Sequence, residues 1–160
     1  MKIRLGNQDD VSQLVDILNE IITIGGTTAY QKPVSASYFD RLLDAPDSKT
    51  FLHVAERDGC VAGFQWIEPL DPPDDHIAGI ATFAKVSGVQ RGIGSALFAR
   101  TRTACRAAGF TEINATIRGD NTGGLAYYSK MGFEDHSVSA NIPLDDGTPV
   151  DRIHKRLDLT

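Results

Sequence analysis

Hydrophobic side chains recur at two different spacings along the chain. They alternate with polar residues in Lys2–Leu5, which predicts a strand, and they fall at every third or fourth position across Val11–Ile22, which predicts a helix. A pair of glycines follows, and a second, shorter helical pattern begins after the capping residue Ser35 and continues to Leu43. The early part of the chain is therefore expected to form a strand and two helices.

The next two apolar stretches, Phe51–Glu56 and Val61–Ile67, flank an Asp58–Gly59 pair that is typical of a tight hairpin. The later predicted elements, in order, are a strand Ile77–Val86, a helix Gly92–Ala107, a strand Glu112–Ile117, a helix Asn121–Lys130, and strands Phe133–Ala140 and Arg152–Leu159. No internal repeat or linker interrupts this order. It predicts one α+β (mixed α/β) domain over residues 1–160, with antiparallel hairpins early and a strand–helix–strand unit later.

Composition narrows the classes of function. The chain has 160 residues, 41% of them hydrophobic, which is enough to bury one hydrophobic core. Its net charge of -5 provides no positive field to bind a nucleic-acid backbone, so a nucleic-acid partner is not expected. Cys60 and Cys105 are far apart and show no metal-site spacing, which suits a reducing compartment. The N-terminus lacks the apolar stretch of a secretory signal, and no apolar run is long enough to span a bilayer. We expect a cytoplasmic protein without a metal or a membrane segment.

A glycine-rich turn between a predicted strand and the longest predicted helix is the first candidate site. Gly92 and Gly94 would leave backbone N–H groups exposed at the helix N-terminus, where the helix dipole favours an anion such as a pyrophosphate. An ordinary strand-to-helix turn is the alternative. Two other phosphate motifs do not fit, because Ser95 follows where a P-loop needs Lys and Leu97 stands where a dinucleotide fingerprint needs glycine.

This turn, Gln90–Leu97, resembles the acyl-CoA pyrophosphate loop of the GNAT acyltransferase superfamily, which has the form Gln/Arg-x-x-Gly-x-Gly/Ala. The chain departs from that form, since Val89 stands at the Gln/Arg position. A second block, Asn121–Phe133, resembles the family's Asn-x-x-Ala-x-x-x-Tyr-x-Lys-x-Gly-Phe pattern, with Gly124 in place of Ala. The resemblance covers nearly the full length of the chain.

The resemblance implies a mostly antiparallel sheet of about seven strands, splayed at the acyl-CoA site, with about four flanking helices. It implies acetyl-CoA as co-substrate and direct attack of an amine on the thioester. Tyr128 falls at the family's usual tyrosine, and because a phenol is protonated at neutral pH it can donate to the leaving thiolate. The implied cofactor-binding residues are Phe83, Ala84, Lys85, Val86, Val89, Gln90, Arg91, Gly92, Ile93, Gly94, Ser95 and Asn121.

Within the superfamily the chain is most similar to phosphinothricin and amino-acid N-acetyltransferases, on the segments Asn19–Glu20, Thr27–Tyr30 and Ile113–Arg118. A small-molecule amine, such as an amino acid, is then the expected acceptor, with Glu20 and Thr28 facing it. A peptide or protein N-terminal acetyltransferase and a non-catalytic acyl-CoA-binding module are the alternatives, and a homodimer is compatible with the sequence.

The general base stays unassigned at this point. Related enzymes often place a carboxylate on the strand before the loop, and Ile80–Ala84 contains none. The remaining candidates, acting directly or through water, are Glu20, Glu68, Asp75 and His76.

Overall fold

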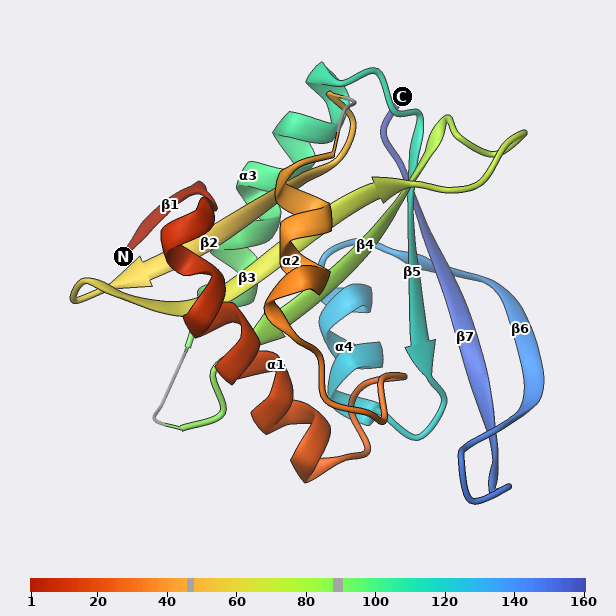
Figure 1. The fold of residues 1–160 in the computed structure, drawn as a ribbon. Helices are drawn as coiled ribbons and strands as arrows, with labels where there is room; N and C mark the ends of the chain where they lie inside the picture. Colours follow the sequence, from red (N-terminus) through yellow and green to blue (C-terminus); the bar gives the residue numbers. More distant parts are fainter. Residues whose placement is uncertain (46–47, 88–90) are drawn as a thin grey trace.

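The fold is known from a computed structural model, which describes residues 1–45, 48–87 and 91–160 (Figure 1). The strands are β1 (Lys2–Leu5), β2 (Phe51–Arg57), β3 (Cys60–Pro69), β4 (Ile77–Ala84), β5 (Glu112–Arg118), β6 (Glu134–Pro143) and β7 (Pro149–Asp158). The helices in the described ranges are the short 3-10 helix η1 (Gln8–Asp10), α1 (Val11–Ile24), α2 (Ala36–Leu43), α3 (Ile93–Ala107) and α4 (Thr122–Lys130). In these ranges, none is long and apolar enough to span a membrane.

One seven-stranded sheet in the order β1-β2-β3-β4-β5-β7-β6 organises the molecule. Neighbouring strands are antiparallel except β4 and β5, which are parallel. Helices α1 and α2 cover one face over the first strands, and α3 and α4 pack on the other face (Figure 1). The predicted single α+β domain with a mostly antiparallel sheet is therefore confirmed.

The parallel pair does not stay together along its length. β4 and β5 are in register from Ile77↔Glu112 to Ile80↔Ala115, and pairing then ends. β4 continues to Ala84 with β3 as its partner, and β5 continues to Arg118 with β7 as its partner. Because each strand is held by its other neighbour, the two diverge and leave an opening through the sheet. This is the splay that the sequence resemblance implied.

Each face of the sheet has its own hydrophobic core. On the α1–α2 face, Leu14, Phe39 and Phe64 are fully buried, and Phe64 stacks with Trp66. On the α3–α4 face, a second cluster includes Phe98. The helical spacing of apolar residues in the sequence thus marked the faces that become buried.

Turn chemistry fixes the first hairpin. Asp58 and Gly59 both have positive φ values, 52° and 77°, as the tight hairpin turn requires.

Strand β4 is shorter than predicted. It ends at Ala84 and not at Val86, whose side chain is half exposed beyond the last residue pair of the β3–β4 ladder.

A buried histidine lies on the α3 side of the sheet. His53 is 2% exposed, and its Nδ1 atom lies 3.1 Å from the Thr101 hydroxyl of α3. Burial, helped by the charge of Arg100, lowers the pKa of His53 to about 4. This environment is that of a neutral histidine with a structural role.

His53 should make the protein acid-sensitive. Its pKa is lower in the folded than in the unfolded chain, so the unfolded state binds the extra proton between about pH 6.5 and pH 4. The free energy of unfolding should fall by roughly 3 kcal/mol from this group as the pH drops through that window. Urea unfolding of the wild type and of His53→Asn at several pH values measures the difference. If the free energy of unfolding had the same pH dependence in both proteins, this prediction would be wrong.

Candidate active site

The opening between β4 and β5 is part of a pocket of about 820 Å³ that reaches both faces of the sheet. Its residues come from the segment after α1, the end of β3, the diverging parts of β4 and β5, and the first turns of α3 and α4. The residues used below are Thr27, Thr28, Tyr30, Trp66, Glu68, Asp71, Thr82, Gly94, Asn114, Thr116, Arg118, Asn121, Tyr127 and Tyr128.

The N-terminus of α3 presents backbone donors beside this pocket. Gly92 precedes the helix in the left-handed conformation, with φ 81°, which explains a glycine there. The first intrahelical bond runs from the Ala96 N–H to the Gly92 carbonyl, at 3.0 Å, and no described side chain caps the helix. The N–H groups of Ile93, Gly94 and Ser95 therefore have no partner within the helix and favour an anion.

Gly94 is needed for a different reason from the one expected. A Cβ atom at this position would lie 2.6 Å from Cε2 of Tyr127, well inside contact distance. The Tyr127 hydroxyl donates to the Gly94 carbonyl oxygen at 2.8 Å. The missing side chain therefore admits the ring of α4 against the start of α3, and the glycine fixes the distance between these two helices.

Tyr128 points into the opening from α4. It is 7% exposed, and its hydroxyl lies 2.8 Å from the Thr82 hydroxyl on β4. Thr82 also accepts a hydrogen bond from Nε2 of Gln65, at 2.8 Å. Burial raises the pKa of Tyr128 above its ordinary value near 10, so the phenol stays protonated and can act as a proton donor.

Asn121 connects the donor side of the pocket to the acceptor side. Its Oδ1 atom caps α4 by accepting from the Gly124 N–H at 2.9 Å, and its Nδ2 donates to the Thr27 carbonyl at 3.1 Å. A Cβ atom on Gly124 would lie 2.4 Å from that Nδ2, so glycine in place of the family's alanine allows this side-chain position. Arg118 makes a second connection, from Nη1 to the Thr28 carbonyl at 3.2 Å.

On the side formed by Tyr30, Trp66, Glu68 and Arg118, which we call the acceptor side after the expected function, the pocket combines an aromatic wall with groups of both charges. Tyr30 and Trp66 lie with ring centroids 6.4 Å apart. Glu68 forms an ion pair with Arg41 of α2 at 2.8 Å. Arg118 is nearly buried and is held by Asp120, at 2.8 Å, which raises the pKa of the guanidinium and keeps its charge fixed.

The structure brings together about half of the residues predicted from the sequence. Those that line the pocket are Phe83, Ala84, Val86, Gly94, Asn121, Tyr128 and Thr28. Lys85, Arg91, Gly92 and Ser95 are exposed and do not line it, while Ile93 is buried beneath the sheet. Val89 and Gln90 lie outside the described residues.

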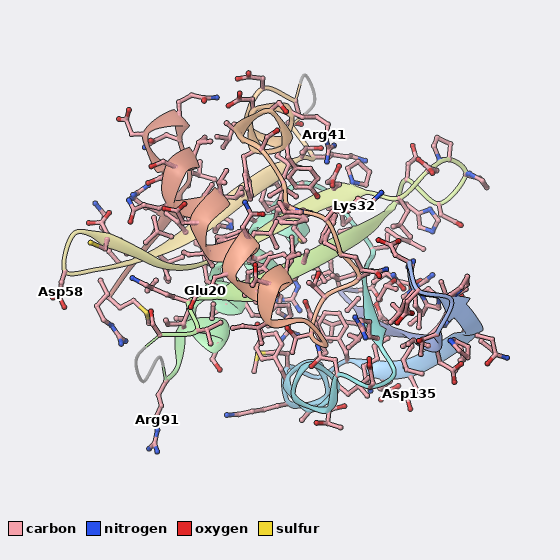
Figure 2. The ribbon with its side chains drawn as sticks, turned by 60° about the horizontal axis from the view of Figure 1, so that its bottom comes forward. Glu20, Lys32, Arg41, Asp58, Arg91 and Asp135 are labelled. Carbon is pink, nitrogen blue, oxygen red and sulfur yellow. The ribbon has the colours of Figure 1, made fainter. Side chains whose placement is uncertain are left out.

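Glu20 is not brought into the pocket. It lies on the solvent-facing side of α1, between the buried positions Leu18 and Ile21, and its side chain is exposed. Figure 2 shows Glu20 on this helix and, at the glycine-rich turn, Arg91 projecting away from the body of the molecule. The acceptor role expected for Glu20 therefore has no geometric support.

Sequence reasoning missed several residues of the pocket. Thr82 could have been found from its place in β4, where strand alternation puts it on the face that α4 covers. Tyr127, the neighbour of Tyr128 in the second motif, also lines the pocket. Arg118 and Thr116 fall in the segment Ile113–Arg118 that resembles the family, but no role was predicted for either, because their positions depend on where β5 leaves β4.

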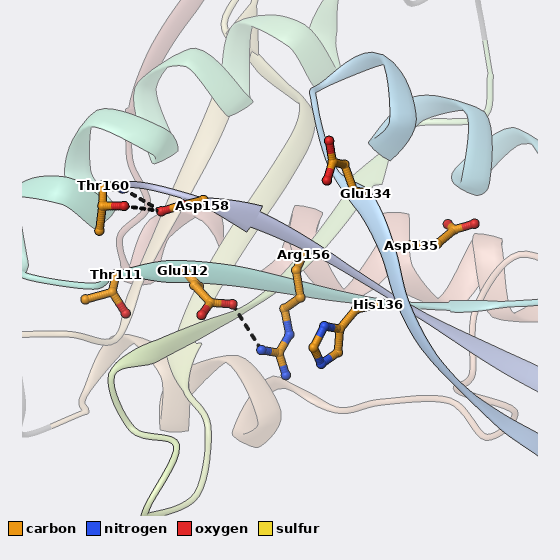
Figure 3. Close-up of a pocket in the computed structure, with 8 residues that line it drawn as sticks. All are labelled: Thr111, Glu112, Glu134, Asp135, His136, Arg156, Asp158 and Thr160. Carbon is orange, nitrogen blue, oxygen red and sulfur yellow. Dashed lines mark hydrogen bonds and ion pairs between the residues drawn. The ribbon is translucent and has the colours of Figure 1, made fainter.

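A second, polar pocket of about 500 Å³ lies on the outer strands (Figure 3). Arg156 is its central cation, and its Nη1 atom lies 3.1 Å from Oε2 of Glu112. The described residues contain no group of three or more His, Cys, Asp or Glu side chains placed to hold a metal ion. This pocket matters below because Arg156 also donates a hydrogen bond to Asn114, which lines the main one.

Comparison with known proteins agrees with the geometry. The family model described as "Acetyltransferase (GNAT) family" matches residues 14–133. The chain belongs to this GNAT family. It is an acetyltransferase, with acetyl-CoA as donor, and the family resemblance drawn from its two motifs is confirmed. No curated protein matches the chain.

Solved GNAT structures share the fold over almost the whole chain. A ribosomal-protein-alanine N-acetyltransferase from Brucella melitensis has a TM-score of 0.90 at 20% identity, covering 99% of both chains. An N-acetyltransferase from Staphylococcus aureus Mu50 has a TM-score of 0.89 at 21% identity, covering 99% of this chain and 98% of the other. A GNAT phosphinothricin acetyltransferase from Sinorhizobium meliloti in complex with AcCoA has a TM-score of 0.88 at 20% identity, with 98% and 87% covered.

The residues of this GNAT chain fit an acyl-CoA. The edge of β4 beyond Ile80 has no strand partner on the β5 side, so its backbone groups there can bond to an extended amide-containing arm. The N–H groups at the start of α3, which have no partner within the helix, suit phosphate oxygens. Tyr128 lies between these two features and the acceptor side.

Replacing Gly94 by alanine should weaken donor binding. The new methyl group collides with Tyr127 and moves the ring or the start of α3, at a cost of about 1–3 kcal/mol in stability. Calorimetry with acetyl-CoA on the folded variant measures the affinity. Gly123→Ala is the matched control, because its Cβ would meet only Asn121 Oδ1 at 3.9 Å, and it should keep wild-type stability. Unchanged affinity in Gly94→Ala would remove this turn from the donor site.

Proposed function

We propose that this GNAT enzyme acetylates a primary amine of a small, amino-acid-like molecule. The observation that carries the proposal is the acceptor side of the pocket, where Arg118 and Glu68 present opposite charges around an aromatic wall. A guanidinium suits the carboxylate of such a molecule, and a carboxylate in the wall suits its ammonium. The segment with Thr27 and Thr28, held by Asn121 and Arg118, closes this side against a long chain.

The donor is positioned by backbone and helix rather than by charged side chains. The start of α3 receives its phosphates, and the free edge of β4 aligns its arm. When bound, acetyl-CoA supplies a thioester carbonyl to the amine and a thiolate leaving group. Holding both reactants in one pocket makes the attack effectively intramolecular, an advantage of about 7–11 kcal/mol at best.

Tyr128 supplies the proton that the leaving sulfur needs. Its hydroxyl sits at the opening, is hydrogen-bonded only to Thr82 among the described residues, and is kept protonated by burial. Tyr127 has a different role, because its hydroxyl is committed to the Gly94 carbonyl and therefore supports the donor-binding turn.

Two neighbouring substitutions separate these roles. Tyr128→Phe should lower kcat by on the order of 10²-fold while leaving acetyl-CoA affinity unchanged, because only the donated proton is lost. Tyr127→Phe should instead raise the donor KM with a smaller change in kcat. Steady-state kinetics and donor titration measure both. Equal kcat for Tyr128→Phe and the wild type between pH 6 and pH 9 would reduce Tyr128 to a packing residue.

The acceptor class is tested with a panel of free amino acids, amines without a carboxylate, and peptides, following thiol release from acetyl-CoA. Amino acids should be the better substrates. Arg118→Gln should raise KM for an amino acid by about tenfold or more, but should change KM much less for the matching amine without its carboxylate. A panel in which peptides are preferred would contradict the proposed acceptor. If Arg118→Gln raised KM equally for the amino acid and for the matching amine, Arg118 would act only by holding the segment that contains Thr28.

A further inference from the structure

The proposed reaction lacks a group to remove the proton from the acceptor ammonium. β4 has no carboxylate along the opening. Glu68 lines the pocket, but its carboxylate is paired with Arg41, so we assign it to holding the ammonium by charge and not to taking its proton. A group that is neutral at physiological pH and can gain a proton is needed on the acceptor side.

A line of hydrogen bonds leaves the pocket through β5 and β7. Thr116 lines the pocket, and its hydroxyl lies 2.9 Å from Nδ1 of His154 on the neighbouring strand. Nε2 of the same imidazole lies 2.8 Å from the hydroxyl of Ser139 on β6. On the other side of Thr116, Asn114 donates from Nδ2 to the threonine oxygen at 3.2 Å.

The direction of this line is fixed at one end. Arg156 can only donate, and its Nε gives a hydrogen bond of 2.7 Å to Oδ1 of Asn114. The amide nitrogen of Asn114 must then face Thr116 and donate to it. Since one lone pair of Thr116 Oγ1 accepts this hydrogen bond, the Thr116 hydroxyl can donate its own proton to Nδ1 of His154. Nδ1 is then the unprotonated ring nitrogen, and the proton on Nε2 faces Ser139.

We propose that Thr116 and His154 form the route by which the acceptor ammonium loses its proton, and this relay rests on the acetylation of an amine proposed above. An N–H bond of the ammonium breaks as its proton passes to Oγ1 of Thr116, while the threonine's own proton passes to Nδ1 of His154. The amine nitrogen keeps the electron pair for attack. His154 then releases the proton to solvent, since its ring is only partly buried.

The surroundings of His154 suit this role. Charged or titratable neighbours are Arg152 and Arg156 on its own strand and His136 on β6, and β5 contributes the neutral Thr116. Burial, followed by these charges, lowers the pKa of His154 below its ordinary value. The imidazole is therefore neutral at pH 7 and becomes unable to accept only as the pH falls below that pKa.

The experiment measures kcat against pH with the best acceptor of the panel. The wild type should lose activity on the acid side, with a midpoint equal to that of His154 followed by NMR in the donor-free protein. His154→Gln should lose about tenfold or more at pH 7 and lose the acid limb. The loss of kcat in His154→Gln should become smaller as the pH approaches the pKa of the acceptor amine. It should also be smaller with a less basic acceptor, because that amine is already neutral.

Matched variants separate the relay from a structural effect. Thr116→Val should reproduce the loss although His154 is present, and Thr116→Ser should restore it. His136→Gln should keep the acid limb, with a midpoint moved slightly upward because a neighbour that lowers the pKa of His154 is gone. Thermal unfolding confirms that each variant is folded.

Two outcomes overturn the relay: a wild-type acid limb retained in His154→Gln, or a loss in that variant that is the same at every pH. Preference for a peptide in the panel would instead contradict the proposed acceptor class. The pH profile for that peptide would still decide the relay, because any ammonium must lose the same proton.

Discussion

The end of pairing between β4 and β5 is the constraint on which the rest of the structure depends. If the ladder continued past Ile80↔Ala115, the sheet would close and no pocket could pass through it. The opening is possible because β3 holds the remainder of β4 and β7 holds the remainder of β5. Two antiparallel neighbours thus stabilise strands that have left each other, and backbone groups at the free edge become available to a ligand at the centre of the domain.

Helix α4 links the two sides of that opening. Through Tyr127 it sets the position of the α3 start, through Tyr128 it contacts β4, and through its capping residue Asn121 it holds the segment over the acceptor side. Each contact is a single hydrogen bond, worth about 1 kcal/mol in net stability. Their value lies in position, because together they fix the distances between the Tyr128 hydroxyl, the N-terminus of α3 and the segment with Thr27.

Much of the fold follows from local signals in the sequence, and only part of the site does. The hairpin at Asp58–Gly59 and the amphipathic faces of α1 and α3 are encoded within short windows, so they were predictable. Tyr128 was found by spacing within one motif. Arg118 and Thr116 could not be found in this way, since their role depends on strand register and on a segment some ninety positions away in the chain. Glu20 was expected at the acceptor from the resemblance of the Asn19–Glu20 segment, but short-segment similarity does not fix which side of α1 a side chain takes, and Glu20 is exposed outside the pocket lining.

The attachment of residues 25–35 has a consequence for how this enzyme can diversify. Several bonds run from side chains of the frame to the backbone of this segment, from Asn19 to Val34, from Arg118 to Thr28 and from Asn121 to Thr27, while Tyr30 packs its ring on Trp66. Bonds to carbonyls and amides do not depend on which side chains the segment carries. The exposed positions of the segment can therefore change side chain while its path is kept, and the strands and helices beneath it need not move when they do.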